Sequence, residues 1–322
     1  MTNTGKQIEF SIIIPLYNEE DSLAELTEEL TSHITALQLN AEIIFVNDGS
    51  TDSSFQRLQE LKKTHISTQI PIIIIDFLTN SGKANALQAG FDHARGNYIF
   101  TMDADLQDDP SEMQKFITKM KEENLDMVSG WKFNRLDPAS KRLPSKIANG
   151  TMKVISGVKI HDMNCGFKLY KASAARTLSL HGDMHRFIPA LLGAKKLKVG
   201  EVKVNHRKRR YGTSKYGIMR LATSFLDLLV VILRTKFFEK PLHFFGGAGF
   251  ILFFLSGISL IYLAILWVFG TEPIGDRPLF TFSLISASLG IQIIMIGLLG
   301  ELLILRTSKR EYVIREIIQP NP

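Results

Sequence analysis

Cysteine is almost absent from this chain, because Cys165 is the only one in 322 residues. A single cysteine cannot form an intrachain disulfide or a cysteine-based zinc cluster, which excludes the disulfide-rich secreted domains. A location facing the reducing cytosol fits this composition. The N-terminal stretch MTNTGKQIEF also lacks the apolar core of a signal peptide, so we do not expect a cleavable signal to export the N-terminal part.

Two common nucleotide-binding fingerprints are missing as well. Gly82-Lys83 looks like the end of a P-loop, but Phe77 stands where the first glycine belongs and Ala84 replaces the serine or threonine. No Gly-x-Gly-x-x-Gly follows a predicted strand in the first half of the chain. A P-loop NTPase and a dinucleotide-binding fold of that type are therefore disfavoured.

Positive charge is in excess in this chain. Lys and Arg number 38 against 32 Asp and Glu, which gives a formal net charge of +6, and hydrophobic residues make up 45%. The excess favours an anionic partner, such as a phosphate, a nucleic acid or a lipid surface. The hydrophobic content is that of a globular chain or of one that lies partly in a membrane.

Short apolar runs alternate with amphipathic segments up to about residue 210. The predicted strands are FSIIIPL (10–16), AEIIFVN (41–47), IPIIIID (70–76), NYIFTMD (97–103) and LDMVSG (125–130). The predicted helices are 19–38, 52–64, 83–94 and 110–123. This alternation predicts an α/β domain with a mostly parallel sheet, in which ligands bind at the carboxyl ends of the strands. The polar clusters YNEE, NDGSTD, NSGKAN and DADLQDD all fall at those ends.

Two long apolar stretches lie near the C-terminus, at about 244–270 and 279–305. The first contains no charge and the second contains only Glu301, and spanning a bilayer takes about 20 apolar residues. We therefore predict a transmembrane hairpin. The flanking basic residues are Arg234, Lys236 and Lys240 before it and Arg306, Lys309, Arg310 and Arg315 after it, whereas the connecting loop carries only Arg277. This bias predicts that both the N-terminal domain and the C-terminal tail are cytoplasmic.

Residues 211–241 differ from both neighbouring parts. The segment KYGIMRLATSFLDLLVVILRTKFFEKP (215–241) mixes charged with apolar residues, which is typical of amphipathic helices in the membrane interface. An ordinary core-packing helix is the alternative. The expected division is thus an α/β domain at 1–210, interfacial helices at 211–241, and the hairpin with its tail at 242–322.

Asp103 and Asp105 come directly after the apolar run YIFTM. On a strand, residues two apart face the same side, so both carboxylates would reach one site at the end of the strand. Hard oxygen ligands suit Mg²⁺ or Mn²⁺, and Gln107 would add a carbonyl oxygen. The alternative is a solvated acidic turn before a helix, which we prefer for Asp108 and Asp109.

Other residues on the same rim suit a nucleoside diphosphate. Pro15, Tyr17 and Glu19 leave the first predicted strand. Asp48 leaves the second beside a glycine turn, where a carboxylate can accept the ring N–H of uracil or guanine. Lys83 offers a cation to a diphosphate.

The motifs SIIIPLYNEE, VNDGSTD, SGKANALQAGFDHARG, TMDADLQDDP and NCGFKLY resemble, in order and spacing, those of the family 2 glycosyltransferases with a GT-A fold, over about residues 8–216. With two C-terminal spans, the chain looks most like the polyprenyl-phosphate glycosyltransferases of the dolichol-phosphate-mannose synthase-like group. The resemblance implies an inverting transfer from a nucleotide sugar. Asp48 would bind the base, and Asp103, Asp105 and Gln107 would bind the metal that holds the diphosphate. The Gln-x-x-Arg-Trp signature of processive polysaccharide synthases is missing, which disfavours a polymerase.

Basic residues are the candidates for binding the acceptor phosphate. Lys132 and Arg135 follow the fifth predicted strand, and a cluster precedes the interfacial segment, with Arg207, Arg209, Arg210 and Lys215 as its proposed phosphate ligands. The alternative is a general polybasic patch that holds anionic lipids. Nucleic acid is a weaker reading, because no nucleic-acid motif is present.

Asp162, in KIHDMNCGFKLY, is the candidate catalytic base, since some relatives place an acidic residue near this motif. A base is barely required, because a phosphate monoester loses its second proton at a pKa of about 6. Cys165 is interpreted as a packing residue, and Arg186 as either a phosphate contact or part of an ion pair. The histidines interpreted as surface or hydrogen-bonding groups are His161, His181, His185 and His206.

The sequence thus predicts a membrane-anchored enzyme that transfers one sugar to a polyprenyl phosphate. The first alternative is an enzyme of the same fold that acts on another membrane acceptor, such as a glycolipid or a cell-wall intermediate. The second is a non-catalytic scaffold that binds nucleotide sugars. Small residues in both spans permit helix contacts within one protomer or in a homo-oligomer and do not choose between them.

Overall fold

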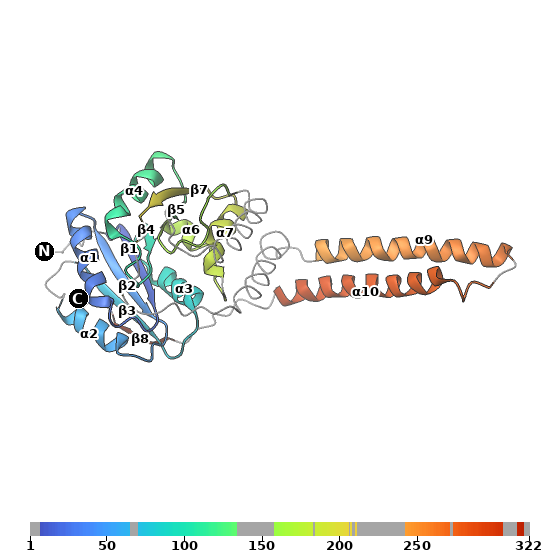
Figure 1. The fold of residues 1–322 in the computed structure, drawn as a ribbon, viewed down its shortest axis with the longest axis horizontal. Coiled ribbons are helices and arrows are strands. Elements are labelled where there is room, and N and C mark those ends of the chain that lie inside the picture. Colours follow the sequence, from blue (N-terminus) through green and yellow to red (C-terminus); the bar gives the residue numbers. More distant parts are fainter. Residues whose placement is uncertain are drawn as a thin grey trace. The chain divides into compact units, whose positions relative to one another are not determined.

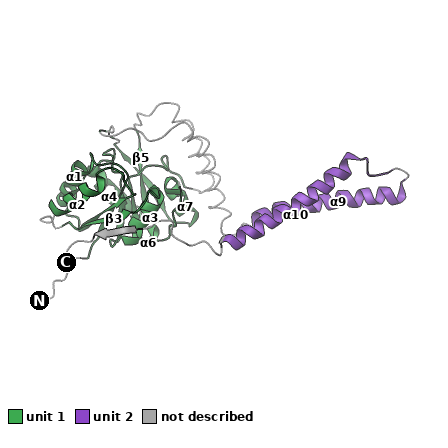
Figure 2. Ribbon diagram, turned by 90° about the horizontal axis from the view of Figure 1, so that it is seen from below, with its two compact units in different colours: residues 1–231, 311–322 green, residues 232–310 purple. Residues whose placement is uncertain are grey.

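The computed structural model describes residues 7–64, 70–133, 158–182, 184–205, 207, 210, 242–270, 273–304 and 314–318. The chain divides into two compact units, 1–231 with 311–322 and 232–310, which Figure 2 colours separately. The first unit is an α/β domain and the second is a pair of long helices (Figure 1). The predicted interfacial helices at 211–241 lie outside the described residues, so that prediction stays untested.

The first unit contains an eight-stranded sheet in the order β7-β5-β6-β4-β1-β2-β3-β8. The strands are β1 (Phe10–Leu16), β2 (Ala41–Asn47), β3 (Ile72–Phe77), β4 (Tyr98–Thr101), β5 (Met127–Lys132), β6 (Lys168–Lys171), β7 (Val199–Val204) and β8 (Ile314–Ile318). The pairs β4-β1, β1-β2, β2-β3 and β5-β7 are parallel, whereas β6 and β8 run antiparallel to their neighbours. The predicted mostly parallel α/β sheet is confirmed.

Helices cover both faces of the sheet, which explains why the central strands β1, β2 and β3 are buried at every position. Ile12 and Ile14 of β1 pack in one core with the helices α1, α2 and α4, while Ile13 packs in a second core with α3, α6 and α7. These helices are α1 (Leu23–Ala36), α2 (Ser54–Thr64), α3 (Lys83–His93), α4 (Met113–Glu122), α6 (Ala172–Ala175) and α7 (Ile188–Ala194). Two short 3₁₀ turns, η2 (Pro110–Glu112) and η3 (Met184–Phe187), precede α4 and α7. The loops at the carboxyl ends of β1, β2 and β4 are thus held on a rigid base.

The tail after the second long helix returns to the sheet as β8. It pairs antiparallel with β3, with Ile74 opposite Ile318 and Asp76 opposite Glu316. The sequence analysis predicted only a cytoplasmic tail here and no strand. Because β8 covers the outer edge of β3, it closes an edge that would otherwise present unpaired backbone groups.

The second unit contains a π-helical turn, η5 (Leu242–Gly246), followed by α9 (Gly247–Phe269) and α10 (Pro278–Ile304). Two helical spans, Leu242–Phe269 and Pro278–Leu303, have mean hydropathy of 2.5 and 2.1, and most of their residues are exposed within the structure. Long helices whose exposed side chains are apolar are stable in a lipid bilayer and not in water. The two helices of this unit agree with the predicted pair of membrane-spanning helices.

Close contact between α9 and α10 depends on small residues. A Cβ on Gly249 would lie 2.5 Å from the carbonyl oxygen of Gly290, so only glycine permits this approach. Ser283 donates a hydrogen bond to Ser259 across the pair (2.8 Å), and Glu301 accepts one from the backbone N–H of Leu242 (3.2 Å). These contacts join the helices within one protomer.

Candidate active site

Two loops at the carboxyl ends of β1 and β2 are tied together by hydrogen bonds. The side chain of Asn18, which has a φ of 54°, accepts a bond from the backbone N–H of Thr51 (2.8 Å), and the hydroxyl of Ser54 accepts one from the N–H of Glu19 (3.0 Å). Tyr17 and Glu19 are half-buried on this rim. The loops therefore form a single ordered edge, where the sequence predicted a nucleotide.

Asp48 joins this edge to the loop before α3. Its carboxylate is 4% exposed and accepts hydrogen bonds from the backbone N–H groups of Ser81 (2.7 Å) and Gly82 (2.9 Å). Burial raises the pKa of Asp48 to about 6, although both hydrogen bonds act to lower it. Gly49 makes the contact possible, because it has a φ of 64° and a Cβ there would lie 2.4 Å from the Thr79 backbone.

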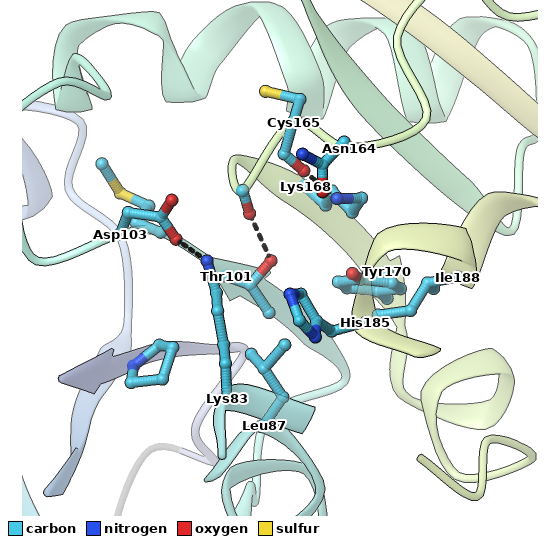
Figure 3. A pocket seen from close by; sticks show the side chains of 13 residues that line it. Lys83, Leu87, Thr101, Asp103, Asn164, Cys165, Lys168, Tyr170, His185 and Ile188 are labelled. Atoms are coloured by element: carbon cyan, nitrogen blue, oxygen red, sulfur yellow. Dashed lines mark hydrogen bonds and ion pairs between the residues drawn. The ribbon is translucent and has the colours of Figure 1, made fainter. Parts of the chain in front are cut away.

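Asp103 lies in a pocket with Lys83, which reaches it from the first turn of α3 (Figure 3). The ammonium of Lys83 and the Oδ1 atom of Asp103 are 2.5 Å apart. Burial alone would raise the pKa of Asp103, but Lys83, Lys132 and Lys168 together bring it below its usual range. Asp103 is therefore a carboxylate at neutral pH.

Asp103 and Asp105 were predicted to lie on one side of a strand. Neither residue is on a strand, because β4 ends at Thr101. Asp103 and Asp105 lie in the turn that follows, where Leu106 takes a φ of 60°. The Oδ1 atom of Asp105 accepts a bond from the N–H of Gln107 (3.2 Å), which orders the turn. The carboxylates are therefore arranged by the turn and not by strand alternation.

Asp108 belongs to the same cluster, so the prediction of a solvated turn is wrong for this residue. It is 2% exposed, accepts a bond from the N–H of Asp103 (3.2 Å) and lies 3.3 Å from the ammonium of Lys132. Burial raises the pKa of Asp108, as do the charges of Asp103 and Asp105, while Lys132 opposes the rise. Asp109 does cap the next turn, since it accepts a bond from the N–H of Ser111 (3.0 Å).

The acidic turn fits a hard divalent cation. Within the described residues, no group of three or more His, Cys, Asp and Glu side chains is arranged to hold a metal by itself. Two carboxylates are nevertheless the usual protein share where substrate phosphates complete the coordination. Gln107 donates its amide N–H to the carbonyl of Arg207 (3.4 Å), so its amide oxygen is the atom that would meet a cation. Gly166 leaves room for the Asp103 carboxylate, because a Cβ there would lie 2.5 Å from its Oδ1 atom.

The opposite wall of the pocket contains residues that the sequence analysis did not place in the active site. Figure 3 shows Asn164, Lys168 and His185 across the pocket from Asp103 and Lys83. Lys168 is 3% exposed and donates a hydrogen bond to the carbonyl of Cys165. NCGFKLY was noted as a motif, but it gave no signal for Lys168, because the burial of this lysine depends on the pairing of β6 with β4.

His185 was interpreted as a surface or hydrogen-bonding group, and the structure places it half-buried at the pocket. Its ring lines the pocket, and burial brings its pKa well below the usual range, with Lys83 and Arg186 adding to the effect. The imidazole is therefore neutral at neutral pH. Cys165 is completely buried, and burial raises the pKa of its thiol to about 12, which confirms that it is a packing residue.

Asp162 lies in the loop before β6. It is 4% exposed, and its carboxylate accepts a hydrogen bond from the N–H of Asn164 (3.1 Å) while its carbonyl accepts one from the hydroxyl of Ser129 (3.3 Å). This geometry holds the loop that carries Asn164. The predicted role of Asp162 as a base stays a prediction.

The predicted acceptor residues fall into three groups. Lys132 lies in the site beside Asp108, as described above. Arg207 contacts Glu29 (2.7 Å) and Asp109 (2.8 Å), and Arg210 pairs with Glu25, so both arginines already have carboxylate partners. The remaining three, Arg135, Arg209 and Lys215, lie outside the described residues.

Three comparisons relate this chain to known proteins. The sequence profile of "Glycosyl transferase family 2" matches residues 11–179. The dodecaprenyl-phosphate galacturonate synthase of Rhizobium johnstonii is 36% identical, over 97% of this chain and 94% of that protein. The undecaprenyl-phosphate 4-deoxy-4-formamido-L-arabinose transferase of Shewanella sediminis is 34% identical, over 92% of this chain and 88% of that protein.

Solved structures share the fold at lower identity. A glucosyl-3-phosphoglycerate synthase from Mycobacterium tuberculosis, in complex with Mn²⁺ and UDP-glucose, has a TM-score of 0.54 at 15% identity and covers 71% of this chain and 79% of its own. A mannosyl-3-phosphoglycerate synthase from Rubrobacter xylanophilus has a TM-score of 0.53 at 13% identity, covering 71% of this chain and 75% of its own. At these identities the likeness shows the fold alone.

Proposed function

Because this chain belongs to glycosyl transferase family 2, we propose that it transfers one sugar from a nucleoside-diphosphate sugar to a polyprenyl phosphate, with inversion at the anomeric carbon. The observation that carries the proposal is the acidic turn of Asp103 and Asp105 at the carboxyl ends of the strands. It occurs in a chain that matches two polyprenyl-phosphate transferases over 97% and 92% of its length. The proposal does not specify the transferred sugar, since those two relatives are named for different sugars.

The donor would lie along the rim formed by the loops after β1, β2 and β4. Asp48 would accept the ring N–H of the base, and Pro15, Tyr17 and Glu19 would line the nucleotide. Lys83 would turn from Asp103 to the diphosphate, because its flexible side chain starts at the first turn of α3 beside the pocket.

A bound Mg²⁺ or Mn²⁺ would neutralise the charge that develops on the departing nucleoside diphosphate, and Asp103, Asp105 and Gln107 would hold it. The chemistry of these oxygen donors and the room left by Gly166 support this assignment. Asp108 and Lys132 would keep the turn in place, since Asp108 binds the backbone of Asp103 and pairs with Lys132.

The acceptor would attack from the face opposite the leaving group. Its phosphate monoester has a second pKa of about 6, so at cytosolic pH the attacking oxygen is mostly charged and requires no base. Asp162 would then only position its loop, whereas a neutral hydroxyl acceptor would need it as a base. Positioning and charge neutralisation supply most of the rate in this account. The proposed phosphate ligands are Lys132, Arg135, Arg207, Arg209, Arg210 and Lys215.

The catalytic domain and the tail are proposed to lie on the cytoplasmic side of the membrane. The basic residues that flank the hairpin support this orientation. The pairing of β8 with β3 supports it as well, because the chain after α10 returns to the domain that precedes α9. Two crossings bring both ends of the hairpin to one side, next to an acceptor that resides in the bilayer.

A panel of donors and acceptors tests the proposal. The full chain in lipid nanodiscs would receive uronosyl, hexosyl and pentosyl nucleotides with Mg²⁺ or Mn²⁺, against polyprenyl phosphate, diacylglycerol and a polyprenyl-diphosphate intermediate. Mass spectrometry should find a glycosylated product with polyprenyl phosphate only. Transfer to another lipid alone would support an enzyme for a different membrane acceptor. Donor binding without any transfer would support a non-catalytic scaffold.

A further inference from the structure

Lys168 is a buried lysine on the pocket wall that faces Asp103. It begins β6, where it is paired with Thr101 at the end of β4, immediately before the acidic turn. Figure 3 shows its side chain beside Asn164 and Cys165 at the pocket. The sheet register therefore fixes the lysine at the reaction site, although the residue lies far from Asp103 in the sequence.

Three lysines line or border this site, and they differ in their partners. Lys83 is paired with Asp103 at 2.5 Å, and Lys132 with Asp108 at 3.3 Å. Among the described residues, Lys168 has no carboxylate partner, and its hydrogen bond goes to the neutral carbonyl of Cys165. An ammonium has three N–H donors, so two of those of Lys168 have no acceptor within the described part of the chain.

A buried ammonium whose N–H donors lack acceptors is unfavourable unless an anion or another acceptor reaches it. Burial lowers the pKa of Lys168, as does the nearby charge of Lys83, while Cys165, Asp162 and Asp103 act to raise it. The charges of Lys83, Arg186 and Lys168 also lower the pKa of His185, whose ring lines the same pocket. Asp103 and Asp162 act on Lys168 only at a distance, since neither forms an ion pair with it in the described part of the chain, so its ammonium can still donate to an anion that enters the pocket.

We propose that Lys168 binds an oxyanion that a substrate brings into this pocket, either the carboxylate of the transferred sugar or the phosphate of the lipid acceptor. The inference rests on the proposed function, which supplies both substrates. Relatives of similar identity are named for a galacturonate, which carries a carboxylate, and for a formamido-arabinose, which carries none. The lysine would compensate for the charge of the bound group and orient it toward the reacting centre.

The test uses the full chain in nanodiscs with Lys168→Met and Lys168→Gln, the second of which keeps an N–H donor for the Cys165 carbonyl. Lys171→Met is the matched control, because Lys171 lies on the same strand but pairs with Asp126 and Asn124. Thermal unfolding shows which of the two uncharged variants, Lys168→Met or Lys168→Gln, is folded, and that variant is used. The dissociation constants of UDP-galacturonate, UDP-galactose and UDP are measured without acceptor, and the KM of polyprenyl phosphate is measured with each donor that turns over.

Loss of a charge-assisted hydrogen bond should weaken one of these steps by about 10- to 100-fold. A loss confined to UDP-galacturonate assigns the sugar carboxylate, and a loss confined to the KM of polyprenyl phosphate assigns the acceptor phosphate. Lys168→Arg should restore much of the affected step, and Lys171→Met should change neither. Changes below about threefold in both arms overturn the proposal, as does an equal loss for UDP, which would place Lys168 on the leaving group. If the wild-type chain binds donors but never glycosylates polyprenyl phosphate, the proposed function is rejected. The binding measurements with donors then test Lys168 alone, and its role is overturned if the variants bind UDP-galacturonate as well as the wild type does.

Discussion

Replacement of Gly166 by alanine should disable the acidic turn without unfolding the domain. A Cβ at this position would lie 2.5 Å from Oδ1, 2.6 Å from Cγ and 2.7 Å from Oδ2 of Asp103. Real Cβ atoms essentially never approach other heavy atoms closer than 3.0 Å. Gly166 is not among the residues with a positive φ, so alanine introduces no backbone strain, and the methyl group acts only on the carboxylate.

The size of the effect follows from that distance. The nearest oxygen of Asp103 has to retreat at least from 2.5 to 3.0 Å, and a metal–ligand distance tolerates only about ±0.2 Å. A misplacement of about 1 Å at a reacting centre lowers the rate by about 100-fold. We therefore expect kcat/KM to fall by between about 10- and 100-fold, and the metal concentration for half-activation to rise. The free energy of unfolding should change by less than about 2 kcal/mol, because only one flexible side chain moves.

The assay is the transfer reaction of the full chain over a range of Mg²⁺ and Mn²⁺ concentrations. Gly257→Ala is the control, since a Cβ there meets no atom within 4 Å. It should leave activity and metal dependence as in the wild type. If Gly166→Ala retained activity within about threefold of the wild type at the same metal half-activation, the position of Asp103 would not control the reaction.

Four further predictions concern the donor site, the acceptor site and the tail. Asp105→Asn should abolish most turnover while the unfolding temperature stays unchanged; retained turnover would refute a metal role. Because the pKa of Asp48 is about 6, acid protonates it, and donor affinity measured by calorimetry should fall by about tenfold between about pH 7 and pH 5, with Asp48→Asn removing the dependence. Arg207→Gln should raise the KM of the acceptor more than that of the donor; equal rises with a lower unfolding temperature would assign it only to the ion pairs it makes. Deletion of residues 314–322 should expose the edge of β3, lower the unfolding temperature and promote aggregation, and unchanged light scattering and melting would count against the β8 pairing.

The sequence alone predicted the first half of the fold well. The strands β1 and β2 match their predicted bounds, because parallel strands buried on both faces are nearly continuous apolar runs. It did not predict β6, whose residues KLYK begin and end with lysine, although the first of these lysines is buried. It also missed β8, since a short tail strand forms only when the edge of β3 is available. Tertiary pairing decides both cases.

The candidate site also contains residues that local motifs predict and residues that only tertiary pairing brings to the pocket. Asp103, Asp48 and Lys83 could be found from local motifs, because each follows a strand or begins a helix at the carboxyl edge. Lys168 and His185 could not, since they reach the pocket from segments whose position depends on the antiparallel pairing of β6 and on the turn before α7. The burial of Asp108 was missed for a similar reason: its partner, Lys132, lies on another strand.

The acceptor preference of the purified chain is the most direct test of this account. Polyprenyl phosphate and the polyprenol of the same length would be offered in the same nanodiscs, with a productive nucleotide sugar and Mn²⁺. The account predicts a polyprenyl-phosphate sugar, lost in Asp103→Asn, and no product from the alcohol. Equal glycosylation of the alcohol, or full activity in Asp103→Asn, would contradict it.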